Sequence, residues 1–230
     1  QGGTFDGGSG EHVIGSLYMA QSATAKATMT SDLCKINGKN TSANKSWRVE
    51  YGGDTFDNAN GTVMFQFNGF DSRMSMRGES HANNAFHNLT IYMNGDTRQI
   101  SPDNGTKIIV DNDLKVTRGK LIMGINHDLE VGGTLTVDDD TTDPAELFMG
   151  SSSNISPKAL TARSIIINSH GTLKASSGIT TVDQGSTYVF RNLGTFTHND
   201  GTLKVARSSA SGTRFLEAGG SLYKLVIDGS

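Results

Sequence analysis

Pairs of apolar residues follow one another every six to eight positions between Thr106 and Asp140. One residue separates the two members of each pair, and this spacing places both side chains on the same face of a β-strand. Glycine, asparagine, aspartate or the triplet Thr-Arg-Gly lies between the pairs, and these residue types favour tight turns. The chain is therefore restricted to short strands joined by very short turns. The four pairs are Leu114/Val116, Leu121/Met123, Leu129/Val131 and Leu135/Val137.

Two all-β architectures can be built from this pattern. In an antiparallel meander or β-sandwich each hairpin returns the chain along its neighbour, whereas in a parallel β-solenoid each strand turns a corner and successive coils stack. The very short turns and the imperfect internal repeats favour the solenoid. We expect an all-β fold, a right-handed parallel β-helix or β-solenoid with short strands, inserted loops and about 20–25 residues per coil. The alternative is a set of β-sandwich-type units.

A repeated tetrapeptide extends this prediction to individual residues. DLKV begins at Asp113, and DLEV begins at Asp128, fifteen residues later. If the copies belong to neighbouring coils, their apolar side chains point inward and stack on each other. The residues predicted to do so are Leu114, Val116, Leu129 and Val131. Asn-Gly pairs favour hairpins, so we also expect loops that interrupt the winding. These pairs begin at Asn37, Asn60, Asn68, Asn94 and Asn104.

A longer motif, here called the TF motif, carries phenylalanine five positions before glycine. GTFTHNDGTLKV spans Gly194–Val205, DTFDNANGTVMF spans Asp54–Phe65, and the first residues of the chain approximate the same motif. We interpret it as the start of a structural unit, in which phenylalanine fills the interior and the Asn/Asp-rich turn bonds to its own backbone. Glycine is expected to take a positive φ at the corner. The pairs are Phe5/Gly10, Phe56/Gly61 and Phe196/Gly201.

The copies of the TF motif predict three segments. Residues 1–52 form an N-terminal repeat-like segment, residues 53–192 a central β-solenoid, and residues 193–230 the truncated start of a further repeat. Both ends of the sequence resemble cuts within a longer polypeptide, since no initiating methionine is present and the chain stops directly after the strand-like LVIDGS.

Composition excludes several classes of protein. The formal net charge of −3 and the pI of about 6.1 provide no general attraction to nucleic acid. The single cysteine, Cys34, excludes a fold braced by an intramolecular disulfide, and we interpret it as a small apolar strand residue. The sequence contains no run of about 18 apolar residues, so we expect no membrane insertion.

Three stretches resemble a class of repeat found in β-solenoid segments of phage tail fibres, other virion fibres and bacterial surface adhesins. They are Gly194–Val205, Phe86–Ile91 (FHNLTI) and Asp113–Val137, and they cover about a fifth of the chain. The resemblance implies a structural or attachment role in an extracellular or virion-surface fibre. It further implies self-association, often as homotrimers. The expected partners are other fibre or virion proteins and a cell-surface glycan. It supplies no catalytic residue.

The alternative functions are a tailspike-like polysaccharide depolymerase built on the same scaffold and a capsid decoration protein. No nucleophile–base motif is present, so we expect no catalytic residue, no cofactor and no catalytic metal. The densest source of oxygen ligands is the run VDDDTTDPAE. We interpret it as a solvated loop that prevents off-register pairing, with a structural calcium site as the alternative. Its acidic residues are Asp138, Asp139, Asp140, Asp143 and Glu146.

Other chemically versatile residues are scattered through the chain. Trp47, in the stretch Trp47–Gly53, is expected to cover the end or side of the solenoid, or to form a small contact site. The histidines are interpreted as polar turn residues, with metal binding or a pH response as the alternative; they are His12, His81, His87, His127, His170 and His198. N-glycosylation sequons, which matter only in a eukaryotic source, begin at Asn40, Asn44, Asn60, Asn88, Asn104 and Asn154.

Overall fold

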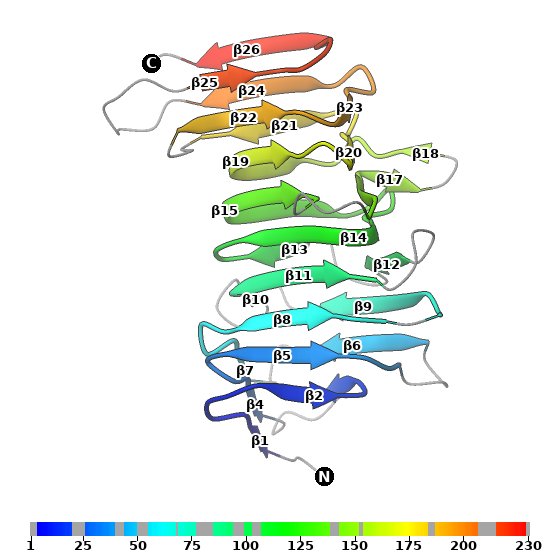
Figure 1. Cartoon of the computed structure of the whole chain (residues 1–230), viewed down its shortest axis with the longest axis vertical. Helices are drawn as coiled ribbons and strands as arrows, with labels where there is room; N and C mark the ends of the chain where they lie inside the picture. Colours follow the sequence, from blue (N-terminus) through cyan, green and yellow to red (C-terminus); the bar gives the residue numbers. More distant parts are fainter. Residues whose placement is uncertain are drawn as a thin grey trace.

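The structure, a computed structural model, describes residues 4–19, 26–39, 44–49, 55–67, 69–76, 85–93, 99–102, 107–138, 143–151, 154–183, 187–206 and 215–228. All regular elements within these ranges are β-strands, and the described residues contain no helix. The strands stack along the long axis of the molecule, from β1 (Thr4–Asp6) at one end to β26 (Lys224–Asp228) at the other (Figure 1). The prediction of an all-β parallel solenoid is confirmed.

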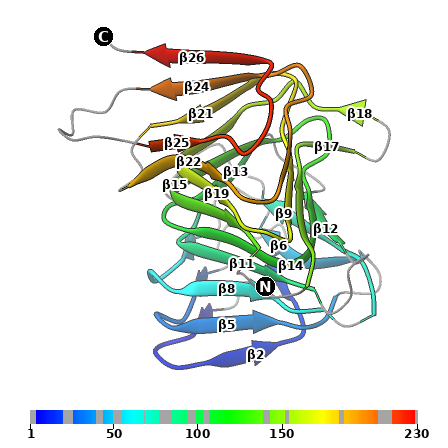
Figure 2. The same cartoon turned by 45° about the horizontal axis from the view of Figure 1, so that its top comes forward.

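The coils have three sides, and neighbouring coils pair through parallel ladders on each side (Figure 2). Side 1 contains two ladders of described strands. The first consists of β1, β4 (Lys26–Thr28) and β7 (Thr55–Asp57), and the second of β10 (Ala85–Phe86), β13 (Lys107–Val110), β15 (Asp128–Val137), β19 (Leu160–Ile167), β21 (Ile179–Val182), β24 (Thr202–Ala206) and β26. Side 2 contains β2 (His12–Ile14), β5 (Leu33–Ile36), β8 (Thr62–Phe65), β11 (Asn88–Tyr92), β14 (Leu114–Ile122), β15, β19, β22 (Tyr188–Asn192) and β25 (Phe215–Glu217). Side 3 contains β3 (Leu17–Met19), β6 (Lys45–Val49), β9 (Ser72–Met76), β12 (Gln99–Pro102), β14, β16 (Ala145–Phe148), β20 (Gly171–Lys174) and β23 (Thr195–Thr197).

Strands β14, β15 and β19 are long enough to turn a corner and contribute to two sides. In β15 the register against β19 shifts between Val131 and Thr134, and Gly132 and Gly133 occupy the bend. A Cβ atom on Gly132 would lie 2.2 Å from the carbonyl oxygen of Asp111 in the preceding coil. Glycine is therefore required at this corner because the two backbones approach each other closely.

The period of the winding differs from the period visible in the sequence. Leu114 pairs with Leu135 of the next coil, so one coil spans three of the steps at which the apolar pairs recur. Each of those steps is the distance from one side to the next. The length of a coil varies along the chain: the shortest described coil runs from Leu160 to Thr180, and the longest runs from Leu129 to Leu160.

This period corrects the interpretation of the DLxV repeat. Leu114 and Val116 belong to side 2, whereas Leu129 and Val131 belong to side 1, so the two copies lie on adjacent sides and do not stack on each other. The prediction that all four point inward is confirmed, because each is at most 2 % exposed. Leu129 stacks between Ile108 and Leu160.

The TF motif forms a corner and does not mark the start of a coil. In the first two copies the motif leads from side 1 to side 2, whereas the third copy leads from side 3 to side 1. The expectation that each phenylalanine fills the interior holds fully for Phe56, which is buried. Phe5 and Phe196 are only partly buried against the core.

The predicted reason for glycine in the TF motif is correct in one copy and wrong in two. Gly10 has a φ of +100°, but Gly61 and Gly201 do not adopt positive φ. In those two copies the residues before glycine take that conformation, as in Asn60 with a φ of +59° and Asp200 with a φ of +62°. Glycine is needed instead because a Cβ atom on Gly61 would lie 2.0 Å from a backbone oxygen of the preceding coil.

Side chains fill the interior, and several aromatic rings cluster in its N-terminal half. Trp47 is fully buried, and its ring centroid lies 5.5 Å from that of Phe56, 6.2 Å from Phe65 and 5.1 Å from Phe86. These rings come from all three sides and join neighbouring coils. The prediction that Trp47 covers the end or side of the solenoid, or forms a contact site, is wrong, because a ring of this size stabilises most when it is removed from water on all sides.

One antiparallel pair occurs among the described strands. β17 (Gly150–Ser151) and β18 (Asn154–Ile155) form a small hairpin that projects from the stack (Figure 1). It belongs to the longest described coil and contains no Asn-Gly pair. Asn37 and Asn60 lie instead at corners of the winding, and the remaining Asn-Gly pairs, at Asn68, Asn94 and Asn104, begin outside the described residues.

Candidate functional site

In the fold, the described acidic residues of the run VDDDTTDPAE lie apart, and each has its own partners. Asp138 is fully buried with a φ of +72°, and its Oδ2 accepts a 2.9 Å hydrogen bond from the backbone N–H of His170. Its carbonyl oxygen accepts a 2.8 Å bond from Asn168 Nδ2. Asp138 therefore holds a corner of the next coil, and its interpretation as part of a solvated loop is wrong. Asp143 pairs with Arg118 at 3.2 Å; Asp139 and Asp140 lie outside the described residues.

Glu146 joins three successive coils on the outer surface of side 3. Its two carboxylate oxygens lie 2.9 Å from Lys120 Nζ and 2.6 Å from Lys174 Nζ. Burial alone would raise the pKa of Glu146, but hydrogen bonds and charge from the two lysines outweigh it and lower the pKa below its ordinary value of 4.5. Glu146 thus stays ionised as the centre of a ladder of charges that runs along the axis.

Replacing Glu146 by Gln is expected to lower the free energy of unfolding at pH 7 by about 1 kcal/mol. Since the folded-state pKa is lowered, the wild-type advantage is present above the unfolded value of 4.5 and is lost as pH falls through the folded pKa. Urea unfolding at pH 7 and at pH 3 measures this difference. Glu130→Gln is the control, because Glu130 and Lys107 form a more exposed pair. Equal destabilisation by Glu146→Gln at both pH values would contradict the assignment.

The described histidines do not gather at one place. Among the described residues, no group of three or more His, Cys, Asp or Glu side chains is arranged to hold a metal ion. His12 Nε2 donates to the carbonyl oxygen of Gly7 at 2.7 Å, and buried His127 Nδ1 donates to that of Met123 at 2.9 Å. These contacts give both histidines a structural role. His127 lies in the turn before β15, as predicted, whereas His12 is the first residue of strand β2, so its interpretation as a turn residue is wrong. His81 lies outside the described residues.

Cys34 is confirmed as a buried strand residue of β5, where it stacks between His12 and Val63. Burial raises the pKa of its thiol from 9.0 to about 11. Because only the thiolate reacts, we expect a thiol reagent at pH 8 to modify the folded chain about 100-fold more slowly than the chain in urea. Absorbance of the released chromophore measures both rates, and equal rates would show that Cys34 is accessible.

One surface depression lies on side 2 and is polar. It has a volume of about 290 Å³ and is lined by Thr62, Asn88, Thr90, Asn112, Asp113 and Lys115. Asn88 Oδ1 accepts a 2.9 Å bond from Asn112 Nδ2, and Asp113 Oδ1 accepts a 2.8 Å bond from the backbone N–H of Thr134. Sequence reasoning missed this depression, because its residues come from three coils and are brought together only by stacking.

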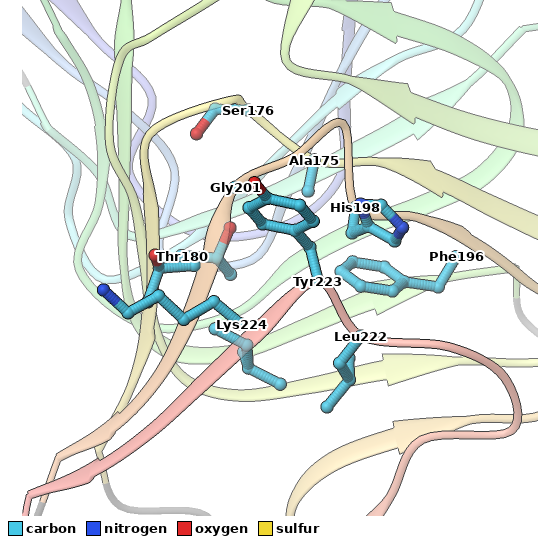
Figure 3. A pocket seen from close by; sticks show the side chains of 11 residues that line it. Ala175, Ser176, Thr180, Phe196, His198, Gly201, Leu222, Tyr223 and Lys224 are labelled. Carbon is cyan, nitrogen blue, oxygen red and sulfur yellow. The ribbon is translucent and has the colours of Figure 1, made fainter.

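Another depression lies near the C-terminal end, and its volume of about 10 Å³ is that of a single water site (Figure 3). The rings of His198 and Tyr223 stack with centroids 5.7 Å apart and enclose one part of it. His198 Nδ1 accepts a 3.0 Å bond from the backbone N–H of Asp200, which holds the imidazole in place. Phe196 and Leu222 give the depression an apolar floor, where the last coil lies on the one before it.

This chain matches no protein-family model, no curated protein and no solved structure. No helix in the described part of the chain is long and apolar enough to cross a membrane.

The sequons differ in their accessibility. Asn44, Asn60 and Asn154 are exposed, and Asn88 is half-buried within the polar depression. Asn40 and Asn104 lie outside the described residues. A ligand can therefore reach only the outer surface, which consists of short ladders of side chains with shallow depressions. The interior beneath it is filled by side chains.

Proposed function

We propose that this chain is a structural and attachment segment of a fibre displayed on a cell or virion surface. One observation carries the proposal: apolar residues on each of the three sides stack in register from coil to coil. The interior is consequently solid, and the backbone hydrogen bonds between parallel strands point along the axis. Such a stack suits a rod that transmits force and presents its outer surface to a partner.

The pairing of the outward carboxylates supports this role over that of a depolymerase. Glycoside hydrolysis needs two carboxyl groups that flank a sugar, about 5–9.5 Å apart. In the described stack several carboxylates instead contact cations, as in Glu146 with its two lysines, Glu217 with Arg191 at 3.1 Å and Asp228 with Lys204 at 3.0 Å. These pairs connect coils, which is a structural use of charge. The polar depression holds one carboxylate, Asp113, together with Lys115.

The test separates attachment from cleavage. The chain, immobilised on a surface, is exposed to a panel of purified cell-surface polysaccharides, and both retention and new reducing ends are measured, with heat-denatured chain as the control. We expect saturable retention of at least one glycan without new reducing ends. Reducing ends that disappear in Asp113→Asn but persist in Glu130→Gln would establish the depolymerase instead. Absence of retention across the panel would contradict the attachment role.

A further inference from the structure

The polar depression on side 2 is built from three successive coils. Its residues lie on or just before β8, β11 and β14, which stack one above another (Figure 1). Asn88 pairs with Thr62, and Thr90 pairs with Lys115, in the parallel ladders of this side. Asp113 lies at the corner immediately before β14. The volume of about 290 Å³ is close to the lower limit of small-molecule sites, which is about 300 Å³.

Hydrogen bonds within the depression hold two of its side chains in place. Asn88 Oδ1 accepts bonds of 2.9 Å from Asn112 Nδ2 and 3.3 Å from the backbone N–H of Asp113. These bonds fix the orientation of the Asn88 amide. Asp113 Oδ1 accepts a 2.8 Å bond from the backbone N–H of Thr134 in the next coil. The amide and the carboxylate are therefore held in position before a ligand arrives, which lowers the entropy cost of binding.

Other polar atoms of the depression have no partner within the described part of the chain. Asn88 Nδ2 and Lys115 Nζ make no hydrogen bond or ion pair there, and the same holds for Asp113 Oδ2. The side-chain hydroxyl groups of Thr62 and Thr90 are also unbonded among the described residues. The depression thus offers both donors and acceptors, and its one carboxylate and one ammonium group leave it without net charge.

This combination fits the hydroxyl groups of a neutral sugar. A hydroxyl group both donates and accepts hydrogen bonds, so adjacent hydroxyls of a pyranose ring can bind a carboxylate oxygen and an amide N–H together. A charged ligand gains little net attraction from a site without net charge, and an extended peptide needs pockets for its alternate side chains. Neighbouring coils lie about 4.8 Å apart, and an extended chain of pyranose rings advances by a similar distance per ring.

We propose that this depression binds a neutral glycan whose chain runs along the axis of the rod, across β8, β11 and β14. Asp113 Oδ2 accepts hydrogen bonds from sugar hydroxyl groups, and Asn88 Nδ2 and Lys115 Nζ donate to them. The hydroxyl groups of Thr62 and Thr90 bind neighbouring rings. Because the depression holds one carboxylate, it lacks the pair that hydrolysis needs, and the glycan is retained intact. This inference rests on the proposed attachment function and adds to it the site and the class of glycan.

Titration of the isotope-labelled chain with short oligosaccharides, followed by NMR, tests the location of the site. The neutral probes are glucan, galactan and mannan oligosaccharides, and an oligogalacturonate of equal length is the anionic comparison. We expect at least one neutral probe to cause saturable shifts of the side-chain amide signals of Asn88 and Asn112, and oligogalacturonate to bind more weakly. Saturable shifts confined to another surface would overturn the inference and leave the attachment function in place, as would tighter binding of oligogalacturonate.

Two conservative variants test the individual contacts. Asp113→Asn retains the oxygen that accepts from Thr134 but replaces Oδ2 by a donor, and Thr90→Val removes a hydroxyl group at nearly constant volume. Each should weaken binding of the neutral probe about tenfold or more. The matched controls are Glu130→Gln on side 1 and Thr172→Val on side 3, which should bind like the wild type. Thermal melts establish that all four variants are folded.

The outcomes separate this inference from the attachment function. Binding that neither Asp113→Asn nor Thr90→Val weakens would overturn the inference alone, because the glycan would then occupy another surface. Failure of every neutral probe to bind, while polysaccharides of the panel are still retained, would have the same meaning. Failure of the neutral probes together with absence of retention across the panel would contradict the attachment function as well.

Discussion

Replacing Leu129 by Asp is expected to unfold the central coils. The Leu129 side chain is 1 % exposed and lies between Ile108 of the preceding coil and Leu160 of the next. A carboxylate there would have no cation among its stacked neighbours, and an unpaired buried charge costs several kcal/mol. For a chain of this length, we expect the melting temperature to fall by about 10 °C or more. Thermal denaturation followed by circular dichroism measures the change.

Thr136→Asp is the matched control for this experiment. Thr136 belongs to the same strand, but its side chain is partly exposed, and the strand register places it next to exposed Lys115 of the preceding coil. The same carboxylate at that position stays hydrated beside a cation, so the melting temperature should change by no more than about 2 °C. If Leu129→Asp melts like Thr136→Asp, the inward assignment of Leu129 is wrong.

Replacing Gly61 by Ala is expected to destabilise the N-terminal coils by several kcal/mol. The added Cβ atom would lie 2.0 Å from the carbonyl oxygen of Thr30 and 3.0 Å from that of Asp32. Both are backbone atoms, and Asp32 accepts a 2.7 Å hydrogen bond from the N–H of Thr62. The overlap can be relieved only by moving the two coils apart, which breaks ladder bonds and opens the core. Urea denaturation measures the lost free energy of unfolding.

Gly15 provides the comparison, because it also lies at a corner. A Cβ atom on Gly15 would meet nothing within 4 Å, and its φ is not positive. Gly15→Ala is therefore expected to be neutral or to stabilise the fold by about 0.4–1 kcal/mol through the entropy of the unfolded chain. A small effect at both positions would show that the corner at Gly61 opens without cost.

The strands and their inward faces can be predicted from the sequence because alternation is a local property. The apolar pairs around Leu114 and Leu129 specify which side chains are buried, whichever strands become neighbours. They do not specify the number of sides, since coils with any number of sides can be built from steps of six to eight residues. The three sides are alike in their local chemistry, and so the DLxV repeat predicts neighbouring coils where the fold has neighbouring sides.

The contacts around the candidate sites could not be predicted for a related reason. Glu146 meets Lys120 and Lys174, which come from the coils on either side of it and lie in opposite directions along the chain. Asp138 is part of an acidic run in the sequence, yet its partner His170 is 32 residues away. Such partners depend on the length of each coil, which varies with the insertions that the coil carries. The burial of Trp47 could not be predicted either, because a local pattern does not specify the size of the interior.

The use of one motif at two different corners has a consequence for how such a chain can change. A deletion or insertion of one side's length, about six to eight residues, preserves the alternation of every later strand. It moves each of those strands onto the next side, so the whole later part of the rod turns by a third of a circle about its axis. The core is refilled by equivalent apolar residues, while the outer surface points in a new direction. Small changes of length at a corner can therefore change the direction, about the rod axis, in which the outer side-chain ladders point. The buried core does not determine that direction.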